Sequence, residues 1–246
     1  MRTNVKNDSN DLDAFQSSAP VNFPFTGMNF SSFRLNLVLD HNWVCSKRIV
    51  YERVLNEIGN AIKKSAIKVE SIEELPTELI NQIIDDETEV VEYLLGTAFV
   101  LCQAYIAGVV STVASFHRLA KSQNLPLKTT TGKKQDMLKF GHKENSSSPA
   151  ELIDAFANYF KHRDEWSVNW DKSTGQQQKT VGIIQSVGAE SGSTGNLRQA
   201  SSALGNPDFV DTRIFIDKLE QWYLDLTDAY RTELENLFMG ESKNAQ

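Results

Sequence analysis

Residues 157–166, "ANYFKHRDEW", contain the side-chain types that transfer protons and stabilise negative charge. Asn158 and His162 are four positions apart, so on a helix their side chains are neighbours. An imidazole titrates near neutral pH and can act as a general acid or base. The cations beside it would stabilise charge that develops on a reacting group. The candidate catalytic residues are therefore His162, Asn158, Lys161 and Arg163.

A helix that begins at "SPAE" must position these residues. Ser148 suits the N-cap, Pro149 the first helical position and Glu151 the third, which together make a capping box. We predict a helix over 148–166. On a helical wheel, an apolar stripe faces the core and the polar side carries Asn158 and His162. The predicted core stripe consists of Ile153, Phe156, Ala157 and Phe160.

The Asn-x-x-x-His spacing on a helix of an all-α protein resembles the HEPN domain family. The usual family motif is an arginine, a polar residue that is often asparagine, three further residues and a histidine. Asn158 and His162 match this motif, but Ala157 stands in the place of the arginine. The resemblance implies a helical, often dimeric protein that binds RNA or cleaves it without a metal or other cofactor, in a bacterial stress, antiviral or toxin–antitoxin system. In the family, the arginine and histidine of two subunits converge on one RNA phosphate, so Lys161 or Arg163 would have to replace the missing cation.

The same residues also allow a non-enzymatic interpretation. A histidine and two cations at the C-terminal end of a helix interact favourably with the helix dipole. With Ala157 in the arginine position, the chain would then be a nuclease-dead, HEPN-like interaction module, such as an accessory or regulatory subunit. The long amphipathic C-terminal helix would provide a surface for a protein partner. The expected partners are RNA together with a homodimer or another protein.

Positive charge is concentrated in one segment of an acidic protein. The net charge is −7, which argues against nonspecific binding of nucleic acid by the whole surface. The segment from Arg118 to Arg163, however, contains nine Lys and Arg residues and only four Asp and Glu residues. A polar, Lys-rich loop is predicted over 123–147, and it is either a binding loop or a solvated flexible connection. Its candidate RNA-binding residues are Lys128, Lys133, Lys134, Lys139 and Lys143.

Helical periodicity predicts the remaining elements. We expect helices from Ser46, over 77–122, around 178–189 and 196–204, and over 208–238. In the first of these helices, the apolar residues that fall at helical spacing are Val50, Val54, Leu55, Ile58 and Ile62. Because no series of alternating strands or repeats occurs, the expected fold is an all-α helical bundle. The expected organisation is a single helical domain over 33–240, preceded by a disordered or loosely docked arm over 1–32. A short docked strand is possible at "FRLNLVL", residues 33–39.

The run from Tyr93 to Phe116 contains no charged residue and is long enough to span a bilayer. Gln103 near its centre and its many small residues favour a central helix of a bundle, and we expect no membrane span. Cys45 and Cys102 lack metal-ligand spacing, and no secretory signal is recognisable at the N-terminus. A cytoplasmic protein without a metal or other cofactor is expected.

Overall fold

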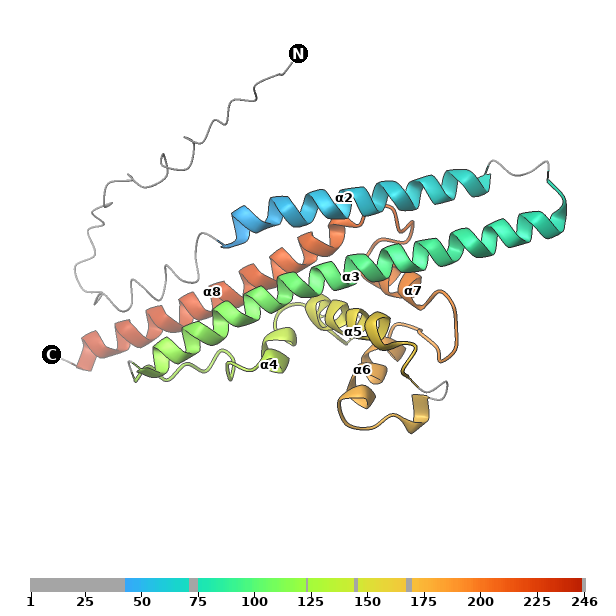
Figure 1. Cartoon of the computed structure of the whole chain (residues 1–246). Coiled ribbons are helices and arrows are strands. Elements are labelled where there is room, and N and C mark those ends of the chain that lie inside the picture. Colours follow the sequence, from blue (N-terminus) through green and yellow to red (C-terminus); the bar gives the residue numbers. More distant parts are fainter. Residues whose placement is uncertain (1–42, 71–74, 123, 144–145, 167–169, 245–246) are drawn as a thin grey trace, which may run out of the picture.

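A computed structural model describes residues 43–70, 75–122, 124–143, 146–166 and 170–244. This part of the chain is all-α, as predicted (Figure 1). The predicted arm over 1–32 and the strand considered at 33–39 lie outside the described residues. The elements are α2 (Trp43–Glu70), α3 (Thr77–Ser122), α4 (Lys134–Leu138), α5 (Pro149–His162), the short 3-10 helix η2 (Trp170–Lys172), α6 (Gly175–Gln185), α7 (Asn196–Ala203) and α8 (Arg213–Asn244).

Three long helices form the frame of the molecule. Figure 1 shows α2, α3 and α8 side by side, with α4, α5 and α6 on the other side of α3. The core lies where α3, α5 and α8 meet. There the Phe99 ring stacks on Phe215, with ring centroids 4.9 Å apart, and lies 5.9 Å from Phe156. Such aromatic contacts add to the free energy gained by burying the rings.

Helix α3 has the bounds that periodicity predicted, and the uncharged run lies in its C-terminal two thirds. It is the one helix among the described residues that is long and apolar enough to cross a membrane, and 44% of its most apolar window is buried inside the protein. The buried positions follow helical spacing, because α3 packs against α2, α5, α7 and α8. They include Leu95, Phe99, Cys102, Ile106, Val109, Val113 and Phe116.

Several boundaries and one apolar face differ from the expectation. Helix α2 begins at Trp43 instead of Ser46. Its Leu55 and Ile62 are buried, but Val50 is 61% exposed, because only one side of α2 packs against the frame. Helix α8 begins at Arg213 rather than at 208, after a turn in which Phe209 has a φ of 63°. A periodic pattern that continues into a turn cannot reveal where the helix starts.

The Lys-rich segment also differs from the expected loop, because it contains α4 and is tied to α8. The Glu233 carboxylate accepts a hydrogen bond from the backbone N–H of Lys128. It also accepts hydrogen bonds from the backbone N–H of Thr129 at 2.9 Å and from the Thr129 hydroxyl at 2.6 Å. The Trp222 indole donates to the Met137 carbonyl at 2.9 Å. These contacts join residues about 100 positions apart, so no local pattern could have shown them.

Candidate functional site

The start of α5 is built as the sequence predicts. The Ser148 hydroxyl accepts a hydrogen bond from the Glu151 N–H at 3.0 Å, and Pro149 occupies the first turn. The same hydroxyl donates to the Leu138 carbonyl, which ties α5 to the end of α4. Ile153 and Phe156 are completely buried, as the predicted core stripe requires. Burial extends over the whole run 152–157, however, so the middle of α5 is enclosed on every side and only its ends reach the surface.

Ala157 is also completely buried. The position that carries the arginine in the HEPN motif therefore points into the core of this protein. A guanidinium at this position would be desolvated among apolar side chains. Any cation that acts together with Asn158 or His162 must come from another position.

The four predicted catalytic residues do not converge on one point. Lys161 donates to the Gln103 carbonyl oxygen at 2.7 Å, and the Gln103 amide donates to Asn158 Oδ1 at 3.0 Å, so these three residues form a group. His162 instead pairs with Glu165, with 3.1 Å between Nδ1 and the carboxylate. The Arg163 guanidinium lies over the Tyr93 ring, 4.4 Å from its centroid.

Arg163 is held on the apolar side of α5. Its guanidinium is also 5.0 Å from the centroid of the Phe160 ring. The flat face of a guanidinium is attracted to an aromatic ring, and this contact orients Arg163 away from Asn158 and Lys161. Of the two flanking cations, Lys161 is therefore the one placed beside Asn158.

Asp154 links the motif to the Lys-rich segment. Its Oδ1 atom accepts from the Gln103 amide and from Lys134 Nζ, both at 2.7 Å. The Asp154 side chain is buried, and these two donors offset the cost of removing its charge from water. Lys134 is among the residues predicted from the sequence, whereas Asp154 and Gln103 are not. One usable signal existed, since Asp154 and Asn158 are four residues apart on the same helix.

A polar cavity of about 540 Å³ lies between α4, α5 and α6, and we call it the lysine cavity. Asn158 lines it together with two lysines of the predicted set, Lys139 and Lys143. Lys179 of α6 is a third lysine in its wall, and Glu151 and Asp154 are its carboxylates. Lys179 was not predicted from the sequence, because α6 lies outside the basic segment. The side chains of Lys128 and Lys133 are exposed elsewhere, before and at the start of α4.

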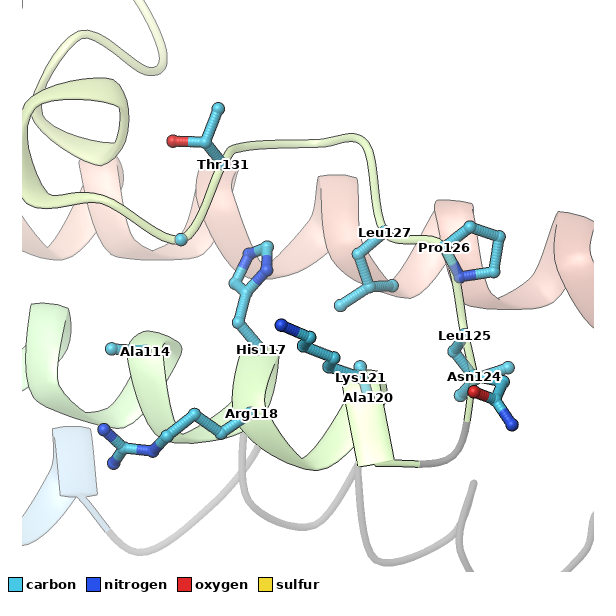
Figure 2. Close-up of a pocket in the computed structure, with 11 residues that line it drawn as sticks. Ala114, His117, Arg118, Ala120, Lys121, Asn124, Leu125, Pro126, Leu127 and Thr131 are labelled. Atoms are coloured by element: carbon cyan, nitrogen blue, oxygen red, sulfur yellow. The ribbon is translucent and has the colours of Figure 1, made fainter.

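A second cavity, of about 620 Å³, lies between the end of α3 and residues 124–132 (Figure 2). Figure 2 shows the His117 ring and the Lys121 amine on the side that faces this segment, and Arg118 directed away along α3. The His117 ring is hydrogen-bonded to the Tyr230 hydroxyl, which also bonds to Thr130 at 2.6 Å. These partners come from segments far apart in the sequence, so the spacing of residues around His117 could not predict them.

Burial controls the protonation of this second site. It lowers the pKa of His117, although the nearby Glu233 carboxylate opposes the shift. It also raises the pKa of Tyr230 to about 12. At neutral pH both rings are therefore uncharged, and the positive charge at this cavity comes from Arg118 and Lys121. Across the described ranges, no group of three or more His, Cys, Asp or Glu side chains is placed to hold a metal ion.

The fold and these sites define a class: an all-α protein with a lysine-lined polar cavity beside a capped, amphipathic helix. The chain matches no protein-family model, no curated protein and no solved structure.

Proposed function

We propose that the protein binds RNA through the lysine cavity, as a HEPN-like protein would. The observation that carries this proposal is that Asn158 of the motif shares the cavity with Lys139, Lys143 and Lys179. Lysine ammonium groups bind the phosphates of a nucleic acid backbone, and asparagine and hydroxyl groups add hydrogen bonds. The cavity combines both kinds of group in one place.

The charge balance of the cavity favours an anionic ligand. One of its two carboxylates, Asp154, is already paired with Lys134 at 2.7 Å. Three lysines then face Glu151 alone. The acidic remainder of the protein repels polyanions, but salt screens this repulsion beyond about 8–10 Å, so it does not prevent RNA from reaching the cavity.

RNA that extends from the cavity along α5 would meet His162. It lies four residues beyond Asn158, a rise of about 6 Å along the helix. Its side chain is 48% exposed and pairs with the Glu165 carboxylate. A carboxylate orients an imidazole for proton transfer, which makes His162 the residue on which any cleavage activity would depend. Lys161 is the adjacent cation.

The test measures the affinity for single-stranded RNA by fluorescence anisotropy in a buffer with EDTA. We expect Lys139→Gln/Lys143→Gln to weaken binding about tenfold, because two phosphate contacts are lost. The matched control is Lys63→Gln/Lys64→Gln, which removes two exposed lysines from α2. Equal affinity of the two double variants, or no binding by the native protein, would overturn the proposal.

The same samples, run on a denaturing gel, separate binding from cleavage. If His162→Ala retains affinity but loses cleavage, the protein is a metal-independent ribonuclease. If neither form cleaves while the native protein binds, it is an RNA-binding protein without nuclease activity. The EDTA prevents a contaminating metal-dependent nuclease from producing the signal.

A further inference from the structure

One face of α3 stays exposed although it carries few charges, and we call it the outer face of α3. Its residues follow one another at intervals of three and four, so they form one stripe on the helix. Val90 is 44% exposed, and Tyr93 is 47% exposed even though Arg163 and Phe160 lie against its ring. From Val90 to Ser115 the stripe is uncharged over about 39 Å of helix. It consists of Val90, Tyr93, Thr97, Val100, Ala104, Ala107, Ser111 and Ser115.

The sizes of these side chains are complementary about the middle of the stripe. Tyr93 and Ser111 are equally far from position 102, and so are Val100 and Ala104. Val90 is as far from this position as Ala114, a half-buried residue beside the stripe. If two copies of α3 packed antiparallel about this point, each large residue of one copy would lie opposite a small residue of the other. Large side chains facing small ones allow close packing without voids or clashes.

The charges at the two ends of the stripe are complementary in the same arrangement. Asp86 and Glu89 lie at its N-terminal end, and Arg118 lies at its C-terminal end. Asp86 and Arg118 are also equally far from position 102. Antiparallel packing therefore places the acids of each copy opposite the arginine of the other. Parallel packing would instead place like charges together, which is unfavourable.

A hollow marks the acidic end of the stripe. It has a volume of about 480 Å³ and is lined by Asp86, Glu89, Val90, Tyr93, Leu94 and Thr97. In the antiparallel arrangement, Arg118 of the second copy reaches this hollow, where two carboxylates are available to its guanidinium. Pairs of this kind set the orientation of a helix pair.

We infer that two copies of the chain form a symmetric dimer through the outer faces of α3 in antiparallel orientation. A bilayer around α3 fits less well, because the opposite side of the helix is buried against α2, α5 and α8. This inference does not depend on RNA binding.

The test is sedimentation equilibrium of the full chain over about 0.5–100 μM, a range that detects dimers with micromolar dissociation constants. We expect a monomer–dimer equilibrium. Ala107→Glu should weaken the dimer by at least about tenfold, because it buries a charge in the uncharged stripe. The control is Ala66→Glu, the same change at an exposed alanine of α2, which should leave dimerisation unchanged.

A charge exchange tests the orientation. We expect Arg118→Asp to weaken the dimer about fivefold, since it then faces Asp86 of the second copy. Asp86→Arg combined with Arg118→Asp should restore the affinity to within about threefold of the native value. In parallel packing Arg118 would face Arg118 of the second copy, so Arg118→Asp would exchange one like-charge pair for another. A dimer of native affinity in Arg118→Asp would therefore indicate parallel packing and overturn the inference.

Three other results would also overturn it. The protein could remain monomeric at 100 μM, or Ala107→Glu and Ala66→Glu could dimerise equally well. A monomer that sediments with phosphatidylcholine vesicles would mean that the face binds lipid.

Discussion

At the scale of single residues, the side chains of Asp154 and His117 each connect several polar partners, and they are buried or half-buried. Asp154 joins Gln103 to Lys134, and His117 joins α3 to Tyr230 and Thr130. Buried polar groups of this kind destabilise the fold when they lose a partner or gain a charge. His117 gives a direct test, since its charge is under the control of pH.

The pH dependence of stability should contain a contribution from His117. Burial lowers its pKa in the folded protein below the ordinary value of 6.5, so the unfolded chain binds the proton more tightly. Stability from this residue is fully present above pH 6.5 and is lost as the pH falls toward the folded pKa. We expect the free energy of unfolding in urea to fall more steeply between pH 7.5 and 5.5 in the native protein than in His117→Gln.

Other groups titrate in the same range, so the comparison needs a second histidine. His142 is exposed, and His142→Gln should retain the native slope. Identical slopes in the native protein and in His117→Gln would contradict the contribution of His117.

At the scale of elements, the crossing of α3 and α5 positions the candidate site. Gly96 makes this crossing possible, since a Cβ atom at this position would lie 2.1 Å from Phe160 Cδ2. The Phe160 ring in turn contacts the guanidinium of Arg163, which lies 5.0 Å from the ring centroid. A small residue in α3 therefore controls how closely the motif helix approaches Gln103.

Replacing this glycine should separate the two helices. We expect Gly96→Ala to lower the free energy of unfolding by about 1–3 kcal/mol, because the methyl group forces Phe160 or the helix to move. Gly182→Ala is the matched control in α6, where nothing lies within 4 Å of an added Cβ atom. That change should raise the free energy of unfolding by about 0.5–1 kcal/mol, as helix propensity predicts. Urea unfolding measures both, and a neutral Gly96→Ala would show that the crossing is looser than described.

At the scale of the whole molecule, the small number of lysines in the cavity limits the electrostatic part of RNA binding. The protein has a net charge of −7, so phosphate contacts outside the cavity are disfavoured. A single strand held by three lysines releases few counterions. The dependence of affinity on salt should accordingly be shallow.

We expect the logarithm of the association constant to fall with the logarithm of salt concentration with a slope of about −2 for three lysine contacts. Removing Lys139 and Lys143 should bring the slope close to −1. Anisotropy titrations from 50 to 300 mM KCl, on the order of the salt range in which this dependence is usually followed, measure both slopes. A slope steeper than about −4 would mean that a wider basic surface binds the RNA.

Local patterns predicted the elements and the face that each buries. The bounds of α3, the Ser148 cap of α5 and the buried stripe of α5 follow from periodicity and capping, which act over one or two helical turns. The same reasoning failed for Val50, since spacing cannot show which side of a helix has a neighbour. It also placed the start of α8 too early, because an apolar pattern continues into the preceding turn.

The sequence by itself determined an all-α fold, a long uncharged helix and a capped helix with a polar face that carries Asn158 and His162. These properties depend on interactions between residues a few positions apart. Only the tertiary structure decided that Asn158 and Lys161 meet at Gln103, that Arg163 stacks on Tyr93, and that Lys179 joins Lys139 and Lys143 in one cavity. The physical reason is that these contacts depend on how the helices cross, and packing of side chains far apart in the sequence sets that geometry.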